Sequence, residues 1–315
     1  MNYSNDKILI IDLGSYSIKA GQACKNKPQI AMRSLIGESN ERHKVIYGED
    51  ALEEPFTPKS LIEYKWDIIQ LRREDMVPLF HTVFEEKLKI SRNDLGSYSL
   101  IFLNGVLQPT EQIKRWYELF LYDFNFEKVA VIEVTEPVFF HAKTDIGLVV
   151  DIGFKSTRFV PYYMGYKMSH AVLSELLGGR EVEKYRDIKI LIEPHRLHRK
   201  LIPHPLSELI IKTIEYCDKN LQQDLFSNII LTGWNAANVN LPKKLKKDIE
   251  TRRPNTLFDI FPASNEYFNW FCASQITQKA QDETGLIHFV SQKDFEGNPN
   301  IIYLPRIVKD SFQNF

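Results

Sequence analysis

The chain of 315 residues has only three cysteines, Cys24, Cys217 and Cys272, and their spacing shows no pairing pattern. This excludes a disulfide framework and a cysteine-based zinc site, so we expect a reducing compartment. No apolar run approaches the ~18 residues that a membrane span needs, and the first residues show no signal-peptide pattern. These absences favour the cytosol or the nucleus.

An excess of charge of either sign is also missing. The 40 Lys and Arg residues nearly balance the 41 Asp and Glu residues, which gives a formal net charge of -1. This argues against a protein whose main role is to coat nucleic acid. The 43% hydrophobic and 26% charged residues are typical of a globular protein, and the length suggests two domains.

The sequence does contain a repeated strand-and-turn motif. Residues 8–21 combine an apolar run with Asp12, a glycine turn and a second apolar run, and residues 147–158 repeat this arrangement around Asp151. A carboxylate at a strand end beside a glycine turn is one way to hold a magnesium-bound phosphate against backbone N–H groups. One such motif alone is equally compatible with a plain β-hairpin, and the second copy favours a functional pair.

Periodicity predicts the other elements. Helical spacing predicts helices over residues 74–90, 109–123, 206–219 and 241–252. Apolar runs predict strands over residues 29–36, 99–103, 129–134 and 258–261. The lysines of residues 241–252 are expected to form a solvated face of their helix.

Several segments resemble actin. The two Asp-x-Gly hairpins and the glycine-ended strand at residues 228–233 resemble the fold that actin shares with Hsp70 and sugar kinases. The segments Val160-Pro-Tyr-Tyr-Met-Gly165, Met168-Ser-His-Ala-Val172 and Leu177-Gly-Gly-Arg180 follow the order of actin motifs, and residues 47–51 and 223–233 also look like actin segments. Because the resemblance is collinear over most of residues 7–295, the chain is identified as a divergent actin-related protein.

The resemblance implies an α/β fold of the actin-like ATPase type, with two duplicated α/β domains around a cleft, a reduced second subdomain and a nearly deleted fourth. The first domain is expected at residues 1–140 plus 264–315, with a reduced outer lobe or a solvated loop insertion at 37–65. The second is expected at 141–263, with residues 181–205 as the remnant of the fourth subdomain. That remnant is rich in His, Arg and Pro, and a short basic linker is favoured over a metal site (His195, Arg196, His198, Arg199, His204).

By resemblance, eight positions match residues that contact nucleotide in actins. They are Asp12, Gly14, Ser15, Lys19, Asp151, Gly153, Thr157 and Gly233. The same residues also hold the hairpins together, so their presence is weak evidence for ATP.

Other positions depart from the actin pattern. Tyr16 replaces a glycine that lets the backbone approach phosphate. Arg158 replaces a histidine, and an arginine cannot accept a proton near neutral pH. Trp234 replaces a glycine beside the nucleoside and is expected to plug that pocket rather than stack on adenine.

Two further departures concern phosphate and water. Phe154 and Lys155 replace the acidic and glycine positions of the second loop, and Lys155 is expected to point into solvent rather than to a phosphate. The glutamine that orients the attacking water falls near Glu133 or Val134. We therefore expect no ATP hydrolysis, no catalytic residue, no metal and no resident cofactor, with ATP or ADP plus magnesium as the alternative.

The resemblance implies a structural subunit of a multi-protein complex. A missing fourth subdomain removes much of one longitudinal surface, so such a subunit would terminate a filament. The small fungal pointed-end actin-related subunit of dynactin shares this plan, which predicts a cytoplasmic cap on an actin-like filament in dynein-dependent transport. Its partners would be actin-like or actin-related subunits, with neither a membrane nor sequence-specific nucleic acid.

Two alternatives stay open. One is an actin-related subunit of a nuclear chromatin-remodelling complex, for which the lysines at 243–247 are the nearest feature to a nuclear localisation run. The other is a residual ATP-binding protein of the actin superfamily.

Overall fold

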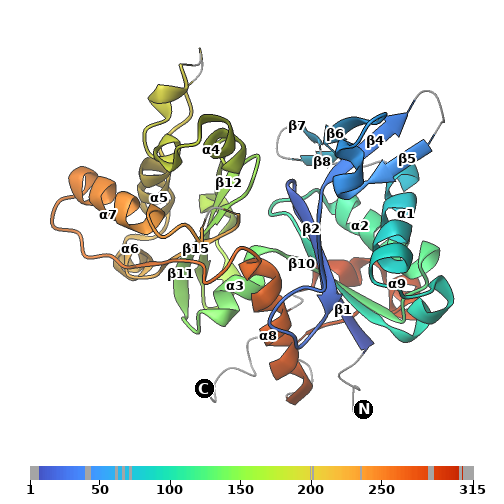
Figure 1. Ribbon diagram of the computed structural model, residues 1–315. Coiled ribbons are helices and arrows are strands. Elements are labelled where there is room, and N and C mark those ends of the chain that lie inside the picture. The colour runs from blue at the N-terminus through green and yellow to red at the C-terminus, as the bar shows by residue number, and fades with distance from the viewer. Residues whose placement is uncertain are drawn as a thin grey trace. The chain divides into compact units, whose positions relative to one another are not determined.

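The computed structural model describes residues 7–39, 44–60, 63–65, 68–70, 73–198, 200, 202–234, 236–282, 287–304 and 307 (Figure 1). It divides into two compact units. Unit 1 comprises Met1–Val134 and Trp270–Phe315, and unit 2 comprises Thr135–Asn269. Each unit is described by itself.

Unit 1 is built on a five-stranded sheet. Its strands, in the spatial order β10-β9-β1-β2-β3, are β10 (Lys128–Glu133), β9 (Ser99–Asn104), β1 (Ile8–Leu13), β2 (Ser17–Gln22) and β3 (Ile30–Arg33). The β1 strand is parallel to β9 and antiparallel to β2. Every residue of β1 is buried, as the unbroken apolar run predicts for a central strand.

Smaller sheets follow in residues 35–70. One is antiparallel in the order β5-β4-β6, with β4 (Leu35–Ser39), β5 (Lys44–Tyr47) and β6 (Thr57–Ser60). The other pairs β7 (Glu63–Lys65) with β8 (Ile68–Gln70). The described part of the expected outer lobe therefore consists largely of strands.

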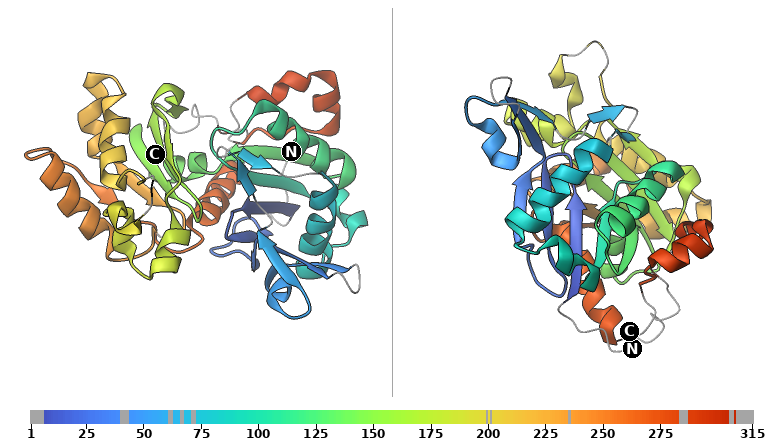
Figure 2. Two further views of the ribbon diagram at one scale, coloured as in Figure 1. Left: turned by 90° about the horizontal axis from the view of Figure 1, so that it is seen from above. Right: turned by 90° about the vertical axis from the view of Figure 1, so that its right-hand side faces the viewer.

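An aromatic cluster joins two helices to the sheet of unit 1. The helix α1 (Arg73–His81) continues as the π-helix η3 (Thr82–Lys87), and α2 (Thr110–Glu118) continues as the π-helix η5 (Leu119–Asp123). These helices lie side by side on one face of the sheet (Figure 2). The ring centroid of Phe120 lies 5.0 Å from that of Phe80 on α1 and 5.1 Å from that of Phe102 on β9.

The C-terminal part of the chain returns to unit 1. In α8 (Phe268–Asp282), the indole Nε1 of Trp270 donates to the carbonyl of Ile10 at 3.1 Å. One turn later, the Ser274 hydroxyl donates to the carbonyl of Lys25 at 2.7 Å. The short α9 (Gln292–Gly297) places Phe295 in the same core, stacked on Tyr117.

Unit 2 repeats the sheet order of unit 1. Its strands are β13 (Tyr166–Lys167), β12 (Thr157–Tyr163), β11 (Ile146–Ile152), β15 (Ile229–Thr232) and β16 (Ile260–Phe261), with β14 (Leu173–Glu175) paired to β12. The β11–β12 hairpin corresponds to β1–β2, and the parallel strands β15 and β16 correspond to β9 and β10. The predicted duplication of an α/β unit is therefore confirmed.

Helices cover both faces of the unit 2 sheet. On one face, α5 (Leu206–Glu215), α6 (Lys219–Phe226) and α7 (Leu241–Arg252) share a core with inward side chains of β11 and β12. On the other, Phe139 of α3 (Thr135–His141) stacks on Tyr162 of β12 with ring centroids 4.6 Å apart. The remaining helix, α4 (Gly179–Tyr185), begins the segment that precedes α5.

Several predicted boundaries are wrong. The predicted helix 206–219 ends earlier, because α5 stops at Glu215, and a separate helix α6, which was not predicted, begins at Lys219. The predicted strand 29–36 is divided between β3 and β4, which belong to different sheets. The predicted strand 258–261 is reduced to Ile260–Phe261, whereas the helix 241–252 has the predicted bounds.

Two of the cysteines, Cys217 and Cys272, are buried thiols. Burial raises the pKa of Cys217 to about 11, with a contribution from the nearby charge of Asp218. Burial also raises the pKa of Cys272 well above its usual value. A thiol with a raised pKa stays protonated at neutral pH and reacts slowly.

The aromatic cluster predicts a large effect of one truncation. We expect Phe120→Ala to lower the free energy of unfolding of unit 1 by about 3–5 kcal/mol, because it removes a fully buried ring that other rings surround. Tyr122→Ala, in the same π-helix but 41% exposed, should cost less than about 1 kcal/mol. Urea unfolding of both variants measures the difference, and equal losses would contradict the placement of the core.

Candidate functional site

All candidate site residues except Gly233 lie in two matching hairpins, one in each unit. In the register of β1 and β2, Asp12 faces Lys19. In the register of β11 and β12, Asp151 faces Arg158. In both hairpins the basic residue follows the aspartate by the same number of positions, so the two ends are structural equivalents.

In unit 1 the aspartate is paired within its own hairpin. The Lys19 Nζ donates to Asp12 Oδ2 at 3.2 Å, and the two side chains are 15% and 7% exposed. An ammonium this close to a nearly buried carboxylate compensates much of its desolvation. The pair is therefore part of the structure of the hairpin itself.

Both hairpin turns need glycine, because a side chain at either position would clash with the backbone. The N–H of Gly14 donates to the carbonyl of Ser17 at 3.1 Å. A Cβ atom at Gly14 would lie 2.9 Å from that carbonyl oxygen, and one at Gly153 would lie 2.8 Å from the carbonyl oxygen of Ser156. Both glycines are thus explained by the turn, and Ser15 lies half-buried in the first of these turns.

Tyr16 is held against the neighbouring strand. The guanidinium carbon of Arg33, on β3, lies 4.1 Å from the centroid of the Tyr16 ring. The N–H of Ser34 donates to the carbonyl of Tyr16 at 2.9 Å, and the Ser34 hydroxyl donates to the carbonyl of Gly14 at 2.5 Å. The cation–π contact with Arg33 and the hydrogen bonds of Ser34 therefore fix this loop to the end of β3 and the residue after it.

In unit 2 the aspartate is also paired within its hairpin. Arg158 Nη1 lies 3.8 Å from Asp151 Oδ2, and the two side chains are 7% and 8% exposed. The arginine that replaces the family's histidine thus faces the aspartate with a permanent positive charge. It is a counter-ion here, and it has no capacity to act as a base.

The hydroxyl of Thr157 has a structural partner. Thr157 is fully buried, and its Oγ1 donates to the carbonyl of Leu177 at 2.7 Å. Next to it, the N–H of Gly179 donates to the carbonyl of Gly153 at 2.9 Å, and the N–H of Arg180 donates to the carbonyl of Phe154 at 2.7 Å. These bonds tie the start of α4 to the second hairpin turn.

Gly233 lies against the same aspartate. It follows β15 with a φ of +94°, and a Cβ there would lie 2.5 Å from the carbonyl oxygen of Ile152 and 2.9 Å from Asp151 Oδ1. Only glycine fits this approach. The structure thus brings Asp151, Gly153, Thr157 and Gly233 into one part of unit 2.

Two departures from the actin pattern contact each other. The rings of Phe154 and Trp234 are packed edge to face, with centroids 5.8 Å apart and planes at 81°. No local sequence signal indicates this contact, because the two residues come from loops far apart in the chain. The contact fills space at the loop ends with aromatic carbon, in the place where the resemblance expects phosphate and nucleoside groups.

The remaining candidates lie at the margins. Glu133 is the last residue of β10 and is half-buried. Val134 is buried, and its N–H donates to the carbonyl of Asn104 at 2.8 Å. Lys155 is half-buried in the second turn.

The residues fit a bound magnesium nucleotide poorly. Magnesium takes carboxylate oxygens and water as ligands, and in unit 2 the guanidinium of Arg158 lies beside the Asp151 carboxylate. The Thr157 hydroxyl donates to Leu177, and the aromatic pair occupies the loop ends. The arrangement is that of two self-contained hairpins.

Neither metal clusters nor membrane spans were found in the described part of the chain. Within it, no group of three or more His, Cys, Asp or Glu side chains is arranged to hold a metal ion. None of its helices is both long enough and apolar enough to cross a bilayer.

A comparison with protein families found one family model that covers both hairpins. The family model described as Actin matches residues 4–204, which is more than half of the chain. Both hairpins lie inside this match, whereas Gly233 and α7 lie beyond it. Together with the shared sheet order of the two units, the match confirms the predicted actin-like α/β fold.

The role of Thr157 can be tested by removing its hydroxyl. We expect Thr157→Val to lower the free energy of unfolding by about 1–3 kcal/mol without any ligand, because the buried carbonyl of Leu177 loses its donor. Thr251→Val, an exposed threonine whose hydroxyl donates to the carbonyl of Lys247, should stay within about 0.5 kcal/mol. Urea unfolding compares the two, and an unchanged stability of Thr157→Val would indicate that the hydroxyl is kept for a ligand.

Proposed function

The chain belongs to the actin family, and we propose that it serves in a larger assembly as a structural subunit without ATPase activity. The observation that carries this proposal is the pairing of Asp151 with Arg158, the arginine that replaces the family's histidine. Arg158 supplies from within the protein a positive charge that a magnesium ion would otherwise bring to this carboxylate. This hairpin therefore needs no cofactor to be stable.

The absence of hydrolysis follows from the same residues. General-base catalysis needs a group that accepts a proton near neutral pH, and Arg158 stays protonated. The Phe154–Trp234 contact supports the proposal further, because it places bulk where a nucleotide would need open backbone. ATP or ADP with magnesium remains the alternative ligand at Asp12, Gly14, Ser15, Lys19, Asp151, Gly153, Thr157 and Gly233.

We further propose that the assembly is an actin-like filament and that the chain caps its pointed end. The support lies in the segment that leads from α4 to α5. Its described residues contain only two short 3₁₀-helices, η7 (Ile188–Leu191) and η8 (Pro194–Leu197). A subunit with so little structure in this region lacks one longitudinal surface, so it joins a filament through one end.

In this proposal the protein works in the cytoplasm, at the cytoskeleton. The filament is that of dynactin, and its partners are the actin-like subunits and the other pointed-end proteins. Dynein-dependent transport is the process in which such a cap would act.

Affinity purification of the tagged protein from its own cells, followed by mass spectrometry, tests the assembly. We expect an actin-like filament subunit together with dynactin arm and pointed-end proteins. A useful control is the same tag on a Phe120→Ala variant, because loss of the core should remove specific partners and leave background proteins. Recovery of a Snf2-type motor with nuclear actin relatives would instead contradict the cap and support a chromatin-remodelling subunit.

A further inference from the structure

Positive charge gathers in two segments of unit 2. Residues 184–200 contain six Lys or Arg against two Asp or Glu, and residues 241–253 contain the same numbers. The chain as a whole has a formal net charge of only -1. The rest of the molecule is therefore acidic, and these two segments are exceptions to it.

The two segments lie together in the folded unit. The 3₁₀-helix η7 of the first segment contacts α7 of the second. Ile190 and Leu191 of η7 belong to the same buried core as Leu245 and Ile249 of α7. Both elements therefore direct their apolar side inward to one core. We call the outward-facing side of these two segments the basic face.

The basic face is lined with exposed cations. The described residues of these segments include exposed Lys and Arg side chains that take no part in an ion pair shown by the structure. They are Lys184, Arg186, Lys189, Lys200, Lys243, Lys246 and Lys247. On α7 the lysines at 243, 246 and 247 lie away from the buried positions 241, 245 and 249, as amphipathic spacing requires.

Three acidic side chains inside these segments, Asp187, Glu193 and Asp248, are paired with arginines of the same segments. The N–H of Lys189 and the guanidinium of Arg196 both donate to Asp187, at 2.9 and 2.7 Å, and lower its pKa. Arg196 also lies 3.5 Å from Glu193. On α7, Asp248 accepts from Arg252 at 2.9 Å. These contacts stabilise the segments and leave the lysines to define the charge of the surface.

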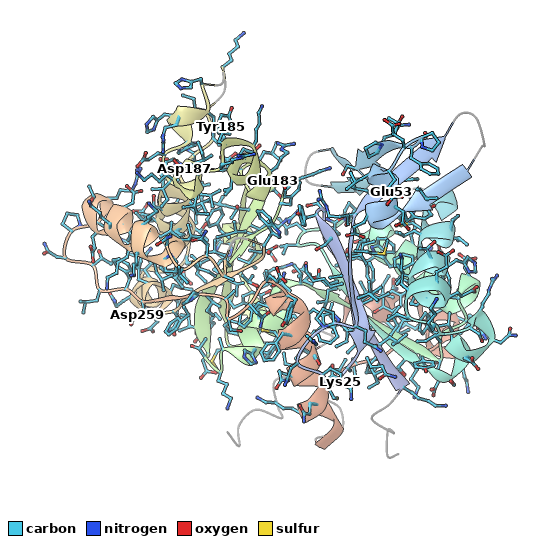
Figure 3. The ribbon with its side chains drawn as sticks, viewed as in Figure 1. Lys25, Glu53, Glu183, Tyr185, Asp187 and Asp259 are labelled. Atoms are coloured by element: carbon cyan, nitrogen blue, oxygen red, sulfur yellow. The ribbon has the colours of Figure 1, made fainter. Side chains whose placement is uncertain are left out.

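One aromatic ring lies among these cations. Tyr185 ends α4, is 37% exposed, and donates its hydroxyl to the carbonyl of Leu197 at 3.3 Å. The Lys184 Nζ lies 5.5 Å from the centroid of its ring. Figure 3 labels Tyr185 near Glu183 and Asp187. A ring that is fixed by its hydroxyl and partly open is suited to contact an apolar side chain of a ligand.

We propose that the basic face binds an acidic polypeptide segment of a partner protein. Like charges held close together repel, and an acidic ligand relieves that repulsion. The exposed carboxylates Glu183 and Glu250 border the same face, and a regularly charged phosphate backbone would meet them. A polypeptide can place its acidic residues against the lysines and an apolar residue against Tyr185. This inference does not depend on which assembly the chain joins.

Fluorescence anisotropy with a labelled Glu-rich peptide that carries one leucine tests the proposal. The variant Lys189→Glu/Lys243→Glu/Lys247→Glu reverses three charges of the face. The control Lys27→Glu/Lys219→Glu/Lys293→Glu reverses three exposed lysines elsewhere and makes the same change in net charge. We expect the first variant to weaken binding at least about tenfold and the control less than about twofold, with affinity falling as salt rises.

Other outcomes would overturn the proposal. Equal weakening by both triple variants would show that net charge alone attracts the peptide. Equal or tighter binding of a single-stranded RNA with the same number of charges would assign the face to phosphate. No binding of the peptide by the wild-type protein would contradict it directly. Replacement of the three face lysines by glutamine, with thermal unfolding of every variant, separates loss of binding from loss of fold.

Discussion

The structure depends on an ion pair that spans each central hairpin. Asp12 and Asp151 are nearly buried at the ends of β1 and β11, and a buried carboxylate without a counter-charge is costly. Lys19 and Arg158 meet them across the hairpin, at 3.2 and 3.8 Å. Because these strands are central to their sheets, their positions influence everything that packs on them. The two units repeat the same solution along with the same sheet order.

Because each aspartate is paired within its own hairpin, the neighbouring hydroxyl and backbone groups form hydrogen bonds within the protein. The Thr157 hydroxyl ties β12 to Leu177, and the backbone at the second turn holds the start of α4. Phe154 and Trp234 then pack on each other at the loop ends. In a relative that binds nucleotide, hydroxyl and backbone groups of this kind face a ligand. Here the same positions contribute to folding, which is consistent with the proposed role of a structural subunit.

The fold was predictable from sequence where its signals are local. An apolar run, an aspartate and a glycine at fixed spacing predict both hairpins, and amphipathic spacing predicts α7 with its bounds. The end of α5 at Glu215 is not predictable in this way, because residues 216–218 contain neither glycine nor proline. The π-helical ends of α1 and α2 were missed because hydrophobic periodicity does not distinguish them from α-helix. Tertiary contacts such as Phe154 with Trp234 join loops that no sequence window contains.

Thermal unfolding with and without magnesium nucleotide tests the central claim most directly. If the hairpin pairs make nucleotide dispensable, the unfolding midpoint of the wild-type protein should be the same with excess Mg-ATP, Mg-ADP or neither. A ligand present at a hundredfold excess over its Kd would add about 2.7 kcal/mol of stability. A rise of several degrees that disappears in Asp151→Asn would contradict the account, because it would show that this carboxylate serves a bound nucleotide.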